Sequence, residues 1–329
     1  MRKVTIEDIS RDTGLSRGTV SRALNDRPDI STQTKQRVLE ACRKLNYVPS
    51  HAARSLATGR NYSVAVLVED LRSAFVAGFV RGVLARALQE RYAVHLIEAG
   101  SKPEDERLRV FSAERIDGAL NAVPLDAARA EELCRIVEGR QLASVWPLVG
   151  VACDVLTPDH TEAGRMATRF LVRQQSRRML YLRRAVTSQA SSQRLAGFQD
   201  ICRESGIDPE DNTLSVDTLE LPEDLGPRLQ EVDAVIAEDD YLAVSAMLAC
   251  ERVGRRPGRD LAVIGCGNEP VSSAIHPSLT TIDFDSEQLG YRMMETLLQR
   301  LGKTKTDIPQ QIPVAPLLIE RETTQHLGR

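Results

Sequence analysis

Apolar residues in the first 47 positions recur at intervals of three and four, and this spacing predicts three short helices. We expect them at residues 6–13, 17–24 and 32–47, because Thr5, Ser16 and Ser31 directly precede them and are suited to capping an N-terminus. Together the helices should close one small core. The apolar positions are Ile6, Ile9, Val20, Leu24, Val38, Cys42 and Leu45.

The pattern changes from residue 63 onward, where apolar runs typical of buried strands alternate with helical stretches such as 75–91 and 161–174. This alternation predicts an α/β body with parallel sheets covered on both faces. The strand candidates are too many for one open sheet, so we expect two doubly wound subdomains with a ligand cleft at the carboxyl ends of the strands. The candidates are residues 63–69, 93–99, 117–123, 142–150, 178–183, 233–238, 261–267 and 279–284.

The composition is that of an ordinary globular protein, with 329 residues of which 42% are hydrophobic and 27% charged. No apolar run is long enough to span a membrane, and acidic residues stand where a secretory leader would be apolar, so we expect a cytoplasmic protein. The six cysteines form no C-x-x-C pair and lie near no histidine at metal-ligand spacing. We therefore expect reduced thiols, no metal and no cofactor.

The net charge of −3 divides unevenly along the chain. Residues 1–60 contain 12 Lys and Arg against 6 Asp and Glu, a net charge of +6, whereas the other 269 residues contain 31 against 40, a net charge of −9. A small basic head on a larger acidic body indicates that the head meets a polyanion.

The stretch GLSRG at residues 14–18 fits the nucleophile motif G-x-S-x-G of serine hydrolases. That motif needs a buried strand before it and an acid and a histidine later in the same domain, but the preceding IEDISRDT is helical in pattern and the head has only His51. Ser16 as a helix cap after a glycine turn is favoured, and no catalytic residue is predicted. GCGNEP at 265–270 resembles a dinucleotide fingerprint only weakly, since Pro270 replaces its third glycine.

The second helix has a packing side and a free side. Val20, Ala23 and Leu24 cluster on one side, and the other carries Arg17, Gly18, Ser21 and Arg22. A helix about 10–12 Å across fits the major groove, where arginines can reach guanine O6 and N7. Helix, glycine turn and capped helix form the layout of a helix-turn-helix head.

Residues 3–60 densely resemble the DNA-binding head and hinge of the lac repressor family of bacterial transcription regulators. The resemblance continues more thinly through GFVRGV, RLAGF, EDDYLAVSAM and PSLTTIDFDSEQLGYRM. It implies a periplasmic-binding-protein-like body, a homodimer and a pseudo-palindromic double-stranded DNA operator. Because the C-terminus has no leucine heptads, we expect no tetramer. The implied divisions are a DNA-binding domain at 1–48, a hinge at 49–61, and a body at 62–329 whose subdomains are 62–157 with 287–315 and 158–286 with 316–329.

The resemblance assigns base reading to Arg17, Gly18 and Arg22, and insertion into the minor groove to Leu56. The linker at 51–59 is too short to be helical alone, so we expect it to fold only when two copies meet on DNA. The other residues predicted to contact DNA are Thr5, Ser16, Thr19, Ser21, Asn25 and Arg54.

The resemblance also places an effector site in the body, with Arg194 as its family arginine and Ala74, Phe75, Asp239, Asp240 and Gly267 as further positions. The usual Asn-Asp pair is Asp239–Asp240 here, and the usual Gly-Phe-Asp is Gly265–Cys266–Gly267, so one sugar-binding carboxylate is missing. Arg183 and Arg184 replace small residues. They favour an anionic metabolite such as a sugar phosphate or sugar acid, unless they are simply surface charges.

The sequence therefore predicts a DNA-binding transcriptional regulator, preferentially a repressor, that responds to a small molecule or a protein partner and is not an enzyme. The alternative is a free-standing ligand-binding or hydrolytic protein with an incidental basic head.

Overall fold

The computed structural model describes residues 4–24, 27–47, 59–98, 116–137, 141–185, 188–209, 212–216, 225–302 and 308–325. Its contacts divide the chain into two compact units, Met1–Tyr62 and Ser63–Arg329. The finer domain boundaries given above stay a prediction.

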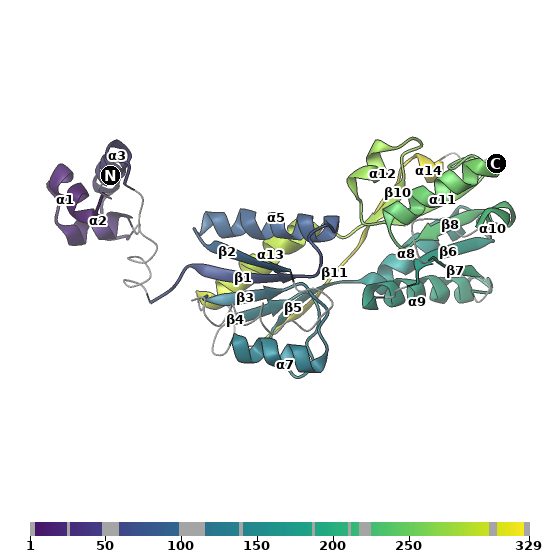
Figure 1. Ribbon diagram of the computed structural model, residues 1–329, viewed down its shortest axis with the longest axis horizontal. Helices are drawn as coiled ribbons and strands as arrows, with labels where there is room; N and C mark the ends of the chain where they lie inside the picture. The colour runs from purple at the N-terminus through teal and green to yellow at the C-terminus, as the bar shows by residue number, and fades with distance from the viewer. Residues whose placement is uncertain are drawn as a thin grey trace. The chain divides into compact units, whose positions relative to one another are not determined.

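The first unit contains the three helices that the sequence predicts (Figure 1). They are α1 (Ile6–Thr13), α2 (Arg17–Leu24) and α3 (Thr32–Lys44). The third helix ends three residues earlier than expected, because Asn46 adopts a positive φ of 50° that stops it. The three helices share one core, whose buried members are Ile9, Val20, Ala23, Val38, Ala41 and Cys42.

The second unit begins with a six-stranded sheet of order β11-β5-β4-β3-β1-β2, in which every pair is parallel. Helices α5 and α13 lie on one side of it and α7 on the other (Figure 1). The elements are β1 (Ser63–Val68), α5 (Ala74–Gln89), β2 (Ala93–Glu98), β3 (Gly118–Asn121), α7 (Ala127–Ile136), β4 (Gln141–Ser144), β5 (Asp154–Pro158), α13 (Ser286–Leu301) and β11 (Gln311–Val314).

A second six-stranded sheet has the order β12-β10-β9-β8-β6-β7 and is parallel except for its edge strand β12. The chain passes between the sheets three times, from β5 to α8, from β10 to α13 and from β11 to β12. The elements are α8 (His160–Arg173), β6 (Met179–Arg184), α9 (Gln189–Glu204), β7 (Thr213–Val216), α10 (Leu225–Glu231), β8 (Ala234–Ala237), α11 (Asp240–Arg252), β9 (Ala262–Cys266), α12 (Pro270–Ala274), β10 (Thr280–Asp283), β12 (Leu317–Ile319) and α14 (Glu322–Gln325).

Strand β6 shows why the sequence folds into covered sheets. Its alternate residues Leu180 and Leu182 pack with α10 and α11, while Met179 and Tyr181 pack with α8 and α9. Because successive side chains of a strand point to opposite faces, an uninterrupted apolar strand buries both faces. The predicted fold class, a helical head and two parallel-sheet subdomains, is confirmed.

Two helix pairs approach each other at glycines. A Cβ added to Gly82 of α5 would overlap the carbonyl oxygen of Glu287 in α13, and one added to Gly197 of α9 would overlap that of Thr161 in α8. Gly164 of α8 faces the Arg194 carbonyl of α9 in the same way. The helix backbones thus touch directly, which no larger residue permits.

The six cysteines are all free thiols in the described parts of the chain. Within those parts no helix is long and apolar enough to cross a membrane, and no group of three or more His, Cys, Asp or Glu side chains could hold a metal.

Candidate functional sites

The exposed side of α2 presents most of the residues predicted to read DNA. Val20 and Ala23 are buried in the head core, whereas Ser16, Arg17, Gly18 and Arg22 are exposed. Ser21 and Thr19 are half-buried at its margin. Asn25, Arg54 and Leu56 lie outside the described residues.

Ser16 is the cap of α2. Its hydroxyl oxygen accepts a hydrogen bond from the Thr19 N–H at 3.1 Å and lies 2.9 Å from the Thr19 hydroxyl. The preceding element is the helix α1, not the strand that a nucleophile motif requires. Thr5, before α1, donates its hydroxyl and N–H to the Asp8 carboxylate at 2.8 and 2.9 Å. Both residues therefore hold helix ends in place.

The two arginines on this surface each have a carboxylate partner. Arg22 Nη1 lies 3.1 Å from Asp29 Oδ2, and Arg17 Nη1 lies 3.7 Å from Glu7 Oε2. All four side chains are more than half exposed, so these pairs remain open to an incoming ligand.

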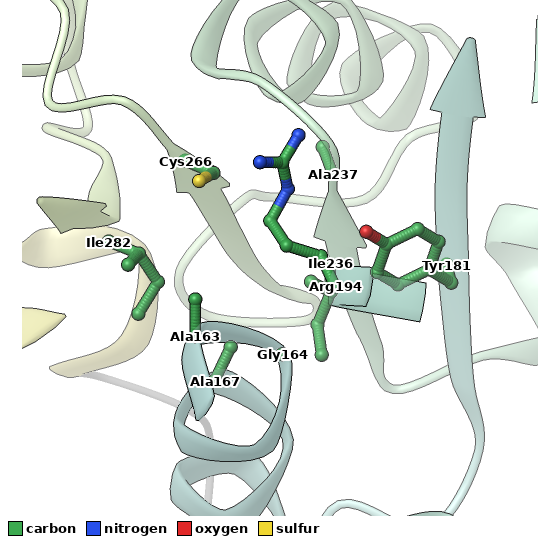
Figure 2. A pocket seen from close by; sticks show the side chains of 10 residues that line it. Ala163, Gly164, Ala167, Tyr181, Arg194, Ile236, Ala237, Cys266 and Ile282 are labelled. Carbon is green, nitrogen blue, oxygen red and sulfur yellow. The ribbon is translucent and has the colours of Figure 1, made fainter. Parts of the chain in front are cut away.

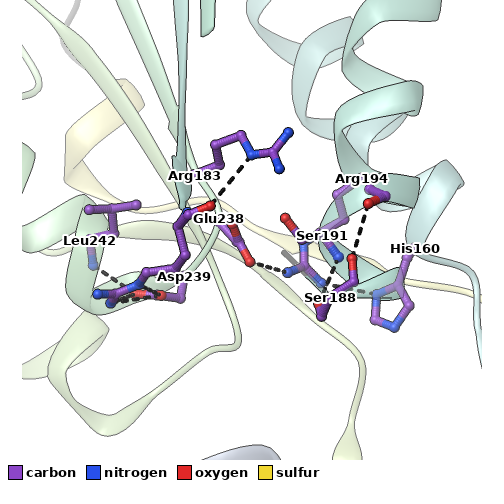
Figure 3. Close-up of polar contacts among 10 residues, drawn as sticks. His160, Arg183, Ser188, Ser191, Arg194, Glu238, Asp239 and Leu242 are labelled. Carbon is purple, nitrogen blue, oxygen red and sulfur yellow. Dashed lines mark hydrogen bonds and ion pairs between the residues drawn. The ribbon is translucent and has the colours of Figure 1, made fainter. Parts of the chain in front are cut away.

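Arg194 is the centre of the predicted effector site. Its Nη1 lies 3.2 Å from His160 Nδ1 and its Nη2 lies 3.8 Å from a Glu238 carboxylate oxygen (Figure 3). Because a guanidinium can only donate, the His160 Nδ1 must accept, and its proton therefore sits on Nε2. Burial, and then the charge of Arg194, lowers the pKa of His160 to about 3, so the ring is neutral.

His160 also joins the two sheets. Its ring stacks on Trp146, which follows β4 of the first sheet, with centroids 5.6 Å apart and 17° between the planes. It meets the edge of Phe284, at the crossing from β10 to α13, at 4.7 Å. Phe75 of α5 packs against the core of the second sheet, in the cluster that includes Phe284. The ring therefore contacts both subdomains and Arg194.

Asp239 and Asp240, which the sequence predicts to contact the effector, are both bound by other groups of the protein. Asp239 caps α11 by accepting from the Leu242 N–H at 2.7 Å and is also ion-paired with Arg184 at 2.9 Å. Asp240 is fully buried and accepts from the Thr281 hydroxyl at 2.5 Å and the Glu269 N–H at 2.7 Å. Asp240 thus ties α11 to β10 and to the loop after β9.

The titration of Asp240 gives a stability prediction. Burial raises its pKa to about 6, above its usual value, so the folded state holds this proton more tightly than the unfolded chain does. Its contribution to stability is then complete below about pH 4 and is lost as the pH rises through about 6. We expect Asp240→Asn to show a smaller fall in melting temperature than the wild type between pH 4.5 and 7, measured by circular dichroism. Parallel pH profiles would contradict this assignment.

A small cavity of about 10 Å³ lies beneath Arg194, among α8 and the ends of β6, β8 and β9 (Figure 2). That is about the space of one water molecule. Arg194 is the only predicted effector residue that lines it; Ala74, Phe75, Asp239, Asp240 and Gly267 do not. Among the described residues, the buried Nε of Arg194 and the hydroxyl of Ser191 find no hydrogen-bond partner.

Sequence reasoning missed Glu238, His160 and Trp146. Glu238 directly follows β8 and precedes the predicted acidic pair, so its position at a strand end was a usable signal. The sequence carries no comparable signal for His160 and Trp146, because they come into contact only through the way the chain passes from one sheet to the other.

Comparison with known proteins fits this architecture. Residues 5–50 match the model of bacterial regulatory proteins of the lacI family, and residues 168–324 match the periplasmic binding protein-like domain. The chain therefore carries a lacI-family regulatory domain and a periplasmic binding protein-like domain. The family resemblance seen in the sequence is thereby confirmed.

Curated relatives match the chain along nearly its whole length. The transcriptional regulator CelR of Thermobifida fusca is 29% identical over 98% of both chains, and the transcriptional repressor PurR of Vibrio atlanticus is 26% identical over 98% of this chain and 99% of its own. A solved lac repressor dimer bound to operator and the anti-inducer ONPF has a TM-score of 0.80 at 24% identity, covering 99% of this chain and 100% of that one. A CelR–cellobiose complex has a TM-score of 0.70 at 24% identity, covering 98% and 100%.

Proposed function

We propose that this protein is a sequence-specific DNA-binding transcriptional repressor, that it acts as a homodimer, and that it is controlled by a small-molecule effector rather than being an enzyme. The observation that carries the proposal is the exposed side of α2, with Arg17 and Arg22 on a packed three-helix head. The names of CelR and PurR and the operator-bound lac repressor support it. A role on bacterial DNA implies action in the cytoplasm.

Removing one reading arginine tests this proposal. Gly18 has no side chain, so discrimination should rest on Arg17 and Arg22, and a bidentate contact to guanine contributes about 1–3 kcal/mol. We expect Arg22→Ala to lose preference for one base in each half-site of a duplex selected from random DNA. The measurement is binding to the selected duplex and to its single-base variants at fixed salt.

The matched control is Arg11→Ala, which removes an exposed arginine from α1 instead of α2. It should weaken binding to all duplexes equally, if at all. If Arg22→Ala also weakened all duplexes equally and kept every base preference, Arg22 would be a phosphate contact and the assignment would be wrong.

For the effector, the arginines of the second sheet support an anionic metabolite such as a sugar phosphate or sugar acid. Arg184 is neutralised by Asp239, and Arg194 faces Glu238 at the longer distance of 3.8 Å. Arg183 donates to the Arg184 carbonyl at 3.5 Å, and no carboxylate of the described chain lies within ion-pair distance of it (Figure 3). Arg183 therefore supplies positive charge that an anion could neutralise.

A thermal-shift screen tests this preference. A ligand at 100 times its Kd stabilises the folded protein by about 2.7 kcal/mol. We expect D-gluconate or glucose 6-phosphate to raise the melting temperature more than glucose does. Arg183→Gln should reduce that rise, and the control Arg173→Gln, at the opposite end of α8 from His160, should not. Stabilisation by uncharged sugars alone would show that the anionic preference is wrong.

The homodimer has a candidate surface on α5 and the edge strand β2. Leu84 and Leu88 of α5 are 48% and 76% exposed, and Leu96 of β2 is 39% exposed. Ala77, Arg81, Leu84 and Leu88 follow helical spacing, so they form one stripe on α5. An exposed apolar patch of this kind marks an interaction surface.

A further inference from the structure

The side chain of Arg22 is held at two points. Its Nη1 donates to Asp29 Oδ2 at 3.1 Å, and its Nε donates to the Gly18 carbonyl oxygen at 3.4 Å, one helical turn earlier. An arginine of a free helix surface would instead sample many rotamers, and ordering it on binding opposes affinity.

Asp29 itself is fixed by the backbone around it. The Arg27 N–H donates to the Arg22 carbonyl at 3.1 Å, which ties Arg27 to the last turn of α2. The Ile30 N–H donates to the Arg27 carbonyl at 3.3 Å, and the Ile30 side chain packs against the head core. The carboxylate between these anchors therefore has a set position relative to Arg22.

The guanidinium keeps enough donors to read a base. Arginine has five N–H groups, and the two contacts use the Nε hydrogen and one Nη1 hydrogen. The second Nη1 hydrogen and both Nη2 hydrogens remain, and two parallel donors suffice for guanine O6 and N7. The two contacts thus restrict the orientation of the Arg22 side chain and leave the N–H groups that would contact guanine available.

We propose that Asp29 is a positioning residue for base recognition. Its ion pair holds the guanidinium of Arg22 in an orientation that suits contact with a base in the major groove, and disfavours the rotamers in which Arg22 would contact phosphates instead. This inference rests on the proposed function and names a residue that determines its specificity. The carboxylate also repels the DNA backbone, which lowers affinity for all sequences alike. The pair of Glu7 and Arg17, at 3.7 Å, is a longer version of the same arrangement.

The test compares Asp29→Asn with Asp12→Asn. Asp12 is ion-paired with Lys44 at 2.6 Å, so its substitution removes the same charge from the same head but leaves the α2 arginines untouched. Both variants should bind a random duplex more tightly. Only Asp29→Asn should lower the ratio of selected-duplex to random-duplex affinity, by about 2- to 5-fold, as expected for loss of an exposed ion pair.

The double variant Arg22→Ala with Asp29→Asn separates positioning from direct contact. If Asp29 acts through Arg22, Asp29→Asn should cause no further fall in the ratio once Arg22 is absent. A further fall, or loss of preference for a cytosine that Asp29 itself could contact, would overturn the inference. An unchanged ratio in Asp29→Asn, matching Asp12→Asn, would overturn it as well. A wild-type protein that bound both duplexes equally would instead contradict the proposed function.

Discussion

Replacing Leu84 and Leu88 together with glutamate is expected to convert the proposed dimer into monomers at micromolar concentration. Both side chains are exposed on the same stripe of α5, so the substitutions should not disturb folding, but dimer formation would have to remove two new carboxylates from water in a largely apolar interface. Because two linked heads gain about 10²- to 10⁴-fold over one, affinity for a palindromic duplex should fall by that order. Sedimentation and duplex binding measure the two effects.

The matched control is Ile308→Glu. Ile308 is 77% exposed and precedes β11, which is the edge strand opposite β2 in the same sheet. It should leave both sedimentation and binding unchanged. If the double variant still sedimented as a dimer, the α5 stripe would not be the interface.

The second large effect is expected from Gly197→Ala. The new methyl group would overlap the Thr161 carbonyl oxygen, which belongs to the backbone and cannot rotate away. Helices α8 and α9 would have to separate, and such overpacking destabilises by about 1–3 kcal/mol. Because Arg194 lies in α9, where α9 contacts α8, the increase in melting temperature caused by an effector should also become smaller. Chemical denaturation and the thermal-shift screen measure these effects.

Gly226→Ala is the control for this substitution. Gly226 lies in helix α10, and the nearest atom to an added Cβ is a Val253 methyl group at 3.3 Å. The Val253 methyl group can move by the few tenths of an ångström that the new Cβ requires, and alanine is the better helix former, so this variant should lose much less stability than Gly197→Ala. If the two variants unfolded at the same denaturant concentration, the glycine crossing would have no special role.

Most central strands were predictable from the sequence, and most edge strands were not; the central strand β5 (Asp154–Pro158) was missed as well. Strands β1, β3, β6, β8 and β9 are continuous apolar runs because both of their faces are covered. The three edge strands that were missed, β7, β11 and β12, have three or four residues each and include exposed positions. Strand β11 also contains Pro313, which an edge strand tolerates. Their pairing depends on the neighbouring strand more than on their own residues.

The two candidate sites differ in the same way. The reading side of α2 follows from helical periodicity within eight residues, so Arg17 and Arg22 could be placed from sequence. The surroundings of Arg194 combine residues of α8 and α9 with residues that follow β4 and β8, and family resemblance alone pointed to that arginine. The hydrogen bond from Thr281 to Asp240 and the ion pair between Arg184 and Asp239 could not be predicted from the sequence, because the partners lie far apart along the chain.

The stack of Trp146 on His160 has a practical consequence. Trp146 is the chain's one tryptophan, so the protein's indole fluorescence comes from this single position between the two sheets. The pKa of about 3 keeps His160 uncharged from pH 5 to 8, so protonation of its neighbour will not quench the emission in that range. A change in wavelength or intensity on adding a metabolite would therefore report a change in the surroundings of this contact between the two sheets, with no label attached.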